Sequence, residues 1–315
     1  MKVVSYLSGI PARNKNPEKP AVLKNFIAGV NLHGHDTGIV TSDTTLIECD
    51  VAVLQGFVHE KSQNVPHLKL RKKVLAHQTS LGKKTIIIDS NLFLYKDTNN
   101  TKRYLRYSYN GVFPTTGEYC NSIVDGYQWK KIKQDLNIDL SPWKLNSDGY
   151  ILLCAQRDGG WSMDGKRVIE WIKETVRDIQ QVTDRPIKLR LHPGDSNIDH
   201  HLRKLRIMSM QTGLKVDVIN CRRTSLLDNL KEASAVVVYN SSPAVAAAIE
   251  GVPVFITDPN PVRCQAYKVA HTNLKDLLAP NDFDRSEWIE KIAQMHWNPK
   301  DLLDGRAWNW MRKWA

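Results

Sequence analysis

The segment 235–258 constrains the fold more than any other part of the sequence. It opens with the apolar run Ala-Val-Val-Val-Tyr, continues through Asn-Ser-Ser-Pro into an alanine-rich stretch, and ends with a second apolar run after Gly251. Runs rich in β-branched residues are typical of buried parallel strands. Ser242 can cap a helix, Pro243 can occupy its first turn, and Gly251 can end it. The segment therefore predicts a strand, a sharp turn, a short helix and a second strand.

The turn of this unit suggests a phosphate site. It places the hydroxyl groups of Ser241 and Ser242 beside backbone N–H groups at the start of a helix, an arrangement that suits an anion. Glu250 ends the same helix and is available for a ribose hydroxyl. The alternative is a plain βαβ crossover in which the serine is only a cap, and the segment alone leaves both interpretations open.

The same alternation of strand-like and helix-like segments runs through both halves of the chain, which predicts an α/β protein with doubly wound parallel sheets. The expected strands cover residues 2–7, 38–41, 49–57, 85–89, 150–154, 186–191, 215–219, 235–239 and 252–257.

The stretch 138–149 interrupts this alternation and carries no strong periodicity, so we expect a domain junction there. We predict an N-terminal Rossmann-like domain over 1–145, a C-terminal one over 146–295, and a tail over 296–315 that packs back toward the N-terminal domain. Tryptophans at near-helical spacing in the tail favour a packing face over a binding box.

Composition narrows the possible partners and compartments. The formal net charge is +11, and such an excess favours a polyanionic partner, either nucleic acid or an anionic glycan. Five cysteines are scattered without a CxxC pair, which argues against a disulfide framework or a zinc site. No apolar run approaches the roughly 20 residues of a membrane span, and no signal-peptide core follows Met1. We expect a cytoplasmic protein without a membrane span, and its oligomeric state stays unknown.

Polar residues follow the expected strands of the second half, at the sheet edge where α/β proteins bind ligands. The loop after 150–154 carries glycines beside the cationic Arg157, which suits a diphosphate. The strand 186–191 leads into His192, which can donate to a phosphate or to a leaving group; the alternative is a core or turn histidine. The expected donor-binding residues are Gln156, Arg157, Gly159, Gly160, Arg190, Asn240, Ser241, Ser242 and Glu250.

In the first half, Asp89 directly follows a buried strand and can serve as a general base or merely as a capping acid. The segment 102–110 interleaves basic and aromatic residues, which suits a polyanion whose bases stack on the rings. Alternatively, it forms a surface β-hairpin with its tyrosines on the core face. The expected acceptor- or DNA-binding residues are His59, Glu60, Arg103, Arg106, Tyr107 and Tyr109.

These features together resemble a known fold. The strand–loop–long helix at 150–182, the strand-end His-Pro and the Asn-Ser-Ser helix start are similar to the nucleotide-sugar domain of GT-B glycosyltransferases. The resemblance implies two Rossmann-like domains that face each other across a cleft. The His-Pro and Ser-Ser pair looks like the polysialyl-, capsule- and glycerophosphate-type transferases. It implies that His192, Ser241 and Ser242 contact the donor phosphate and that Glu250 contacts the ribose.

A second resemblance concerns the acceptor. The strand 51–54, the helix near 67–80 and the strand ending in Asp89 are similar to the phage DNA β-glucosyltransferase, in which the matching acid deprotonates a hydroxymethyl group on a flipped cytosine. The Arg157 loop also parallels the donor loop of that enzyme. For a phage-encoded protein, the compartment is the host cytoplasm.

We therefore predict a glycosyltransferase that inverts the anomeric centre and requires no metal or other cofactor, because no DxD motif stands at a strand end. The expected donor is a nucleotide-diphosphate sugar, with a UDP-sugar preferred, and the expected acceptor is a 5-hydroxymethylpyrimidine in double-stranded DNA, reached by base flipping. Asp89 and His192 are the expected catalytic residues, with Glu60 and Asp36 next in line as base. The alternatives are a transferase acting on a cell-surface or capsular polysaccharide, a nucleotide-sugar epimerase, and a non-catalytic DNA-binding module.

Overall fold

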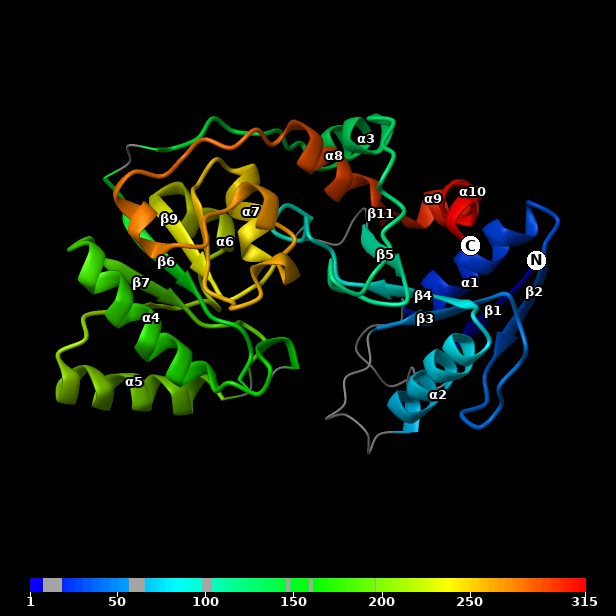
Figure 1. Cartoon of the computed structure of the whole chain (residues 1–315), viewed down its shortest axis with the longest axis horizontal. Helices are drawn as coiled ribbons and strands as arrows, with labels where there is room; N and C mark the ends of the chain where they lie inside the picture. The colour runs from blue at the N-terminus through cyan, green and yellow to red at the C-terminus, as the bar shows by residue number, and fades with distance from the viewer. Residues whose placement is uncertain (8–18, 57–65, 98–103, 146–147, 159–160, 196) are drawn as a thin grey trace. The chain divides into compact units, whose positions relative to one another are not determined.

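The computed structural model describes residues 1–7, 19–56, 66–97, 104–145, 148–158, 161–195 and 197–315 (Figure 1). It divides into two compact units. Unit 1 comprises Met1–Leu136 and Glu290–Ala315, and unit 2 comprises Asn137–Ile289. Each unit is built around a β-sheet of its own.

The sheet of unit 1 has six strands in the order β11-β5-β4-β3-β1-β2. Strands β1 to β4 are parallel, whereas β5 runs antiparallel to β4 and β11 runs antiparallel to β5. The strands are β1 (Lys2–Tyr6), β2 (Asp36–Val40), β3 (Val51–Gln55), β4 (Lys84–Asp89), β5 (Leu105–Tyr109) and β11 (His296–Trp297). The helices are α1 (Lys19–Asn31), α2 (Pro66–Ser80), α3 (Tyr127–Leu136), α9 (Pro299–Leu303) and α10 (Arg306–Met311).

The C-terminal segment is part of the core of unit 1. Helices α9 and α10 pack on α1, and Trp308 lies in the same apolar cluster as Phe26 and Tyr107. The approach of α9 to α1 is close enough to require a glycine, because a Cβ atom on Gly29 would lie 1.9 Å from the Leu302 carbonyl oxygen. The segment therefore completes a core whose other residues come from the start of the chain.

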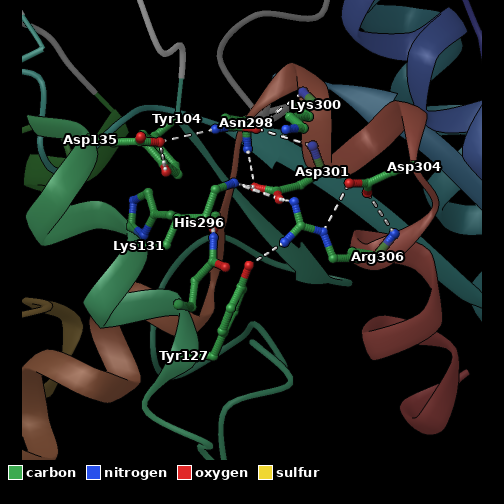
Figure 2. Close-up of polar contacts among 11 residues, drawn as sticks. Tyr104, Tyr127, Lys131, Asp135, His296, Asn298, Lys300, Asp301, Asp304 and Arg306 are labelled. Atoms are coloured by element: carbon green, nitrogen blue, oxygen red, sulfur yellow. Dashed lines mark hydrogen bonds and ion pairs between the residues drawn. The ribbon is translucent and has the colours of Figure 1, made fainter.

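A buried polar network also holds this segment (Figure 2). The Asp301 carboxylate is fully buried and accepts hydrogen bonds from Lys131 of α3 at 2.6 Å, and it pairs with Arg306 of α10 at 2.7 Å. Asn298 and Asp301 form a capping box at the start of α9. Two cations thus compensate a carboxylate that would otherwise be costly to bury.

Unit 2 has a five-stranded sheet in the order β10-β9-β6-β7-β8, and all its neighbouring strands are parallel. Its strands are β6 (Tyr150–Cys154), β7 (Ile187–Arg190), β8 (Asp217–Ile219), β9 (Ala233–Val238) and β10 (Val254–Ile256). Its helices are α4 (Val168–Val182), α5 (Ile198–Thr212), α6 (Leu226–Lys231) and α7 (Pro243–Ile249), and α8 (Ser286–Gln294) begins in it. Because α4 alternates apolar and polar residues at helical spacing, it buries one face, which includes Trp171 and Ile179.

The segment 137–145 belongs to unit 2, not to the N-terminal domain for which it was predicted. Its backbone is bonded to the connection after α7: Ser141 N–H donates to the Ile249 carbonyl at 2.9 Å, and Lys144 N–H donates to the Gly251 carbonyl at 2.7 Å. Gly251 has φ +73°, and a Cβ there would lie 2.0 Å from the Pro142 carbonyl oxygen. The segment looked irregular in sequence because its partners lie more than a hundred residues along the chain.

Candidate functional site

The parallel strands of unit 2 bring the loops that follow β6, β7 and β9 to one edge of the sheet. Asn240, directly after β9, is central to this edge. Its backbone N–H donates to the Gln156 side-chain oxygen at 3.3 Å, and its side-chain amide donates to the Ser162 carbonyl at 3.0 Å and to the Asp258 carboxylate. Gln156 in turn donates to the Ser162 hydroxyl at 2.6 Å. Buried side-chain bonds thus fix the β6 and β9 loops to each other.

Arg157 and His192 lie together at the ends of β6 and β7. The Arg157 Nε–H donates to His192 Nδ1 at 3.4 Å, and the Gly194 N–H donates to the same nitrogen at 3.0 Å. Because two donors face Nδ1, the imidazole carries its proton on Nε2. Burial, and then the neighbouring Arg157 charge, lower the pKa of His192. The ring is therefore neutral near pH 7 and offers Nε2–H as a hydrogen-bond donor.

Gly194 leaves room for the Arg157 guanidinium beside His192. A Cβ atom on Gly194 would lie 2.5 Å from Arg157 Nη2, so the guanidinium lies directly against the backbone that follows His192. The Arg157 side chain is exposed, which leaves its remaining N–H groups available to a ligand. A planar cation that is held in place in this way suits bidentate binding of a phosphate.

Ser241 and Ser242 complete the edge. The Ser241 hydroxyl oxygen is buried and has no hydrogen-bond partner among the described residues. Ser242 is exposed and precedes α7, and its side chain makes no capping bond to that helix. Ser242 is therefore open to a ligand, whereas Ser241 contributes a buried hydroxyl without a partner among the described residues. Because α7 has only seven residues, the side chains rather than a helix dipole are the features of this edge that suit an anion.

A second layer of contacts supports the β6 loop. The Asp158 carboxylate accepts hydrogen bonds from Arg167 Nε at 3.0 Å and from the Val168 N–H at 3.0 Å, which caps α4. The Arg167 bond lowers the pKa of Asp158 to about 2. The Asp158 N–H donates to the Asp195 carboxylate at 2.9 Å. The loops after β6 and β7 are thus bonded to each other behind Arg157 and His192.

Two expected donor residues have different roles in the structure. Arg190 donates to the Asn229 side chain of α6 at 2.7 Å and to the Thr224 carbonyl at 3.0 Å, so it ties β7 to α6 and to the connection before it. Glu250 is the C-terminal cap of α7, about 12 Å along the helix axis from Ser242 at 1.5 Å per residue. Arg190 is therefore bonded within unit 2, and a contact between Glu250 and the ribose of a donor stays a prediction. The expected residues Gly159 and Gly160 lie outside the described residues.

In unit 1, Asp89 ends β4 at the carboxyl edge of the parallel strands. Its Oδ2 accepts a hydrogen bond from the Arg106 guanidinium at 2.7 Å, and 27% of its side chain is exposed. The carboxylate is thus fixed in orientation and still open to solvent. Asp36, an alternative base, begins β2 opposite Lys2 of β1 and therefore lies at the amino edge. Another alternative, Glu60, lies outside the described residues.

The expectation that the segment 102–110 lines a DNA groove is wrong for the residues that the structure describes. Tyr107 is 1% exposed and Tyr109 is 0% exposed, because β5 lies between β4 and β11 and both rings join the core. Arg106 is also buried and pairs with Asp89. The alternative is confirmed for the core-facing tyrosines, but the segment forms an interior strand rather than a surface β-hairpin. His59 and Arg103 lie outside the described residues.

Sequence reasoning missed several residues that build the site. Asp258 and Ser162 hold Asn240, and Asp195 holds the Asp158 backbone. Asp258 follows a β-branched strand, and this signal could have identified it. The role of Ser162 could not be found in this way, because it depends on a contact with a residue of a distant loop.

The two units define an α/β fold of the GT-B type, in which unit 1 carries a mixed sheet with four parallel strands and unit 2 carries an all-parallel sheet. No family model matches the sequence, and no curated protein matches it.

Solved structures match over nearly the whole chain. One is KpsC from Thermosulfurimonas dismutans described as a beta Kdo 2,7 transferase, with 12% identity, coverage of 97% of this chain and 98% of that chain, and a TM-score of 0.53. Another is KpsC from the same organism described as a beta Kdo 2,4 transferase, with 13% identity, coverage of 96% and 97%, and a TM-score of 0.53. The Methanocaldococcus jannaschii UDP-GlcNAc 2-epimerase overlaps less, with 12% identity, full coverage of both chains and a TM-score of 0.36. At these identities the likeness to the two KpsC structures establishes the fold alone.

Within the parts of the chain that the structure describes, none of the helices combines the length and the apolar character needed to span a bilayer.

Proposed function

We propose that this protein is a glycosyltransferase that uses a nucleotide-diphosphate sugar. The observation that carries the proposal is the set of donors at the carboxyl edge of unit 2: the exposed Arg157 guanidinium, the neutral His192 imidazole beside it at 3.4 Å, and the unpartnered Ser241 hydroxyl. Such groups suit an anion that gains charge as a bond breaks.

In the proposed reaction, the acceptor oxygen forms a bond to the anomeric carbon of the sugar as the bond from that carbon to the diphosphate oxygen breaks. Arg157 and the Ser241 hydroxyl bind the departing diphosphate, and His192 donates its Nε2–H to it. Asp89 accepts the proton of the acceptor hydroxyl through a carboxylate whose orientation Arg106 fixes. A single displacement of this kind inverts the anomeric centre. The donor is a UDP-sugar, and no metal is required because cationic and hydroxyl groups bind the diphosphate.

For the acceptor we favour a glycan. The net charge of +11 suits an anionic polysaccharide, and two structures of the same fold are described as Kdo transferases. The burial of Arg106, Tyr107 and Tyr109 removes the stacking surface that the DNA acceptor required.

A 5-hydroxymethylpyrimidine in double-stranded DNA is the second candidate acceptor. The same charge favours it, because cationic surfaces bind phosphate backbones. Retention of duplex DNA that weakens steeply with salt would favour this candidate, and the absence of retention at low salt would leave the glycan.

The test is a transfer assay read by mass spectrometry. The protein is incubated with a panel of nucleotide sugars and with either acidic oligosaccharides or hydroxymethylated duplex DNA. The proposal expects a mass increase of one sugar on one acceptor class and its loss in Asp89→Asn, while the affinity for UDP stays unchanged. Conversion of the donor into an isomeric nucleotide sugar without an acceptor would identify an epimerase instead. Binding without turnover of any donor would identify a non-catalytic module.

A further inference from the structure

Arg71 stands out in unit 1 as a cation without a counter-ion among the residues that the structure describes. It lies in α2, whose charged residues Lys69, Arg71, Lys72 and Lys73 are all basic. The three lysines are exposed, whereas Arg71 is partly buried. Among the described residues, no hydrogen-bond or ion-pair partner faces its guanidinium. Burial lowers the pKa of Arg71, which is the expected effect when a cation loses water without gaining an anion.

The guanidinium occupies a defined place at the carboxyl edge of the sheet. It lies over Gly56, the residue that follows β3, since a Cβ built on Gly56 would lie 3.0 Å from Arg71 Nη1 and 3.6 Å from Cζ. Gly56 has φ +87° and donates its N–H to the Ile88 carbonyl at 2.7 Å. The absence of a side chain at Gly56 therefore makes room for the cation.

The surroundings add groups that can bind a saccharide. Gln55, the last residue of β3, has a buried side-chain oxygen without a partner among the described residues. Strand β4 is paired with β3 and ends in Asp89. The edge thus offers an unpaired planar cation, an unpaired amide oxygen and a carboxylate on neighbouring positions. A guanidinium recognises carboxylates and phosphates, and an amide oxygen accepts from a hydroxyl.

We infer that Arg71, seated on Gly56, binds an oxyanion substituent, a carboxylate or a phosphate, of an acidic saccharide acceptor. The role of the saccharide as an acceptor rests on the proposed function, but its binding at Arg71 is testable without any sugar transfer. A saccharide is favoured over nucleic acid as the ligand of Arg71 because a recessed cation suits a single anionic substituent, whereas a phosphate backbone would bind the exposed lysines of the same helix.

The experiment uses the full-length protein and two matched pairs of probes. One pair is an oligosaccharide of uronic acids and the same oligosaccharide after reduction of its carboxyl groups; the other is a hexose 6-phosphate and the free hexose. Calorimetry measures affinity, and the Arg Nε–Hε signals in an NMR spectrum report on Arg71 itself. We expect each anionic probe that binds to shift the Arg71 signal and each neutral probe to leave it in place.

Substitutions identify the group responsible. Arg71→Gln should weaken binding of the anionic probe by roughly 10- to 100-fold, the effect of one charge-assisted hydrogen bond. Lys72→Gln is the matched control, since it removes one exposed charge from the adjacent position of the same helix and should leave affinity almost unchanged. Arg71→Lys keeps the charge but loses the planar guanidinium that donates two parallel hydrogen bonds, so it should also weaken binding. This variant replaces Arg71→Gln if the latter does not fold.

The inference is overturned if Arg71→Gln and Lys72→Gln bind the acidic probes equally well, if no anionic saccharide shifts the Arg71 signal, or if only duplex DNA shifts it. Failure of the proposed function is separate, because a protein that transfers no sugar can still discriminate the acidic from the neutral probe through Arg71.

Discussion

Replacement of Asp301 by asparagine tests the structure of unit 1 most severely. The carboxylate is fully buried and has two cationic partners, Lys131 at 2.6 Å and Arg306 at 2.7 Å. The amide keeps the size of the side chain but removes its charge, so the cations lose the anion that compensates them. Breaking a buried ion pair in this way costs about 3–5 kcal/mol, and in a unit of this size that corresponds to a fall in Tm of roughly 10 °C.

Asp304→Asn provides the control. Asp304 also pairs with Arg306, at 2.9 Å, but its side chain is 37% exposed. Exposed pairs contribute about 0–1 kcal/mol, so this variant should unfold close to the wild type.

The assay is urea unfolding followed by tryptophan fluorescence, combined with hydrogen exchange of the amides in α9 and α10. We expect faster exchange in both helices of Asp301→Asn and a lower urea midpoint. If the two variants unfold at the same urea concentration, Asp301 is not buried between its two cations and the account of the C-terminal segment is wrong.

Three further predictions follow from individual residues. His296 is fully buried, and burial lowers its pKa to about 3. Because the histidine of the unfolded chain binds a proton below about pH 6.5, the stabilisation from neutral His296 should be fully present above that pH, and the free energy of unfolding should be about 2 kcal/mol lower at pH 5. His296→Gln should reduce this pH dependence in unfolding titrations. Gly29→Ala places a methyl group 1.9 Å from the Leu302 carbonyl oxygen and should destabilise unit 1 by about 1–3 kcal/mol in the same assay; an unchanged urea midpoint would refute the close packing of α1 and α9. Arg157→Gln should weaken UDP binding roughly 10-fold in calorimetry, whereas Arg177→Gln on the exposed face of α4 should not; equal affinities would remove Arg157 from the site.

The alternation of strands and helices was predictable because it is encoded locally. The apolar run at 150–154 became β6 with the same bounds, and the run at 235–239 became β9 over Ala233–Val238. Short β-branched runs between glycines, prolines and caps carry this signal without reference to distant residues. The same reasoning placed polar residues at the carboxyl ends of the strands of unit 2, where Gln156, Asn240 and His192 are found.

Residues whose environment depends on distant segments were not predictable. Tyr107 is buried because β11 pairs with β5, and β11 comes from near the end of the chain. Arg190 resembled a ligand-binding cation in sequence, yet Thr224 of the β8–α6 connection and Asn229 of α6 accept its hydrogen bonds. Arg71 was indistinguishable from the lysines around it, because only the packing of α2 on Gly56 separates it from them.

The central claim is that the carboxyl edge of the sheet in unit 2 binds a nucleotide diphosphate, and a crystal structure of the protein with UDP tests it most directly. The account predicts diphosphate oxygens at hydrogen-bond distance, roughly 2.7–3.2 Å, from the Arg157 guanidinium and the Ser241 hydroxyl, with His192 Nε2 directed at the same group. UDP bound at another place, or crystals grown at saturating UDP in which these side chains contact no nucleotide, would contradict it.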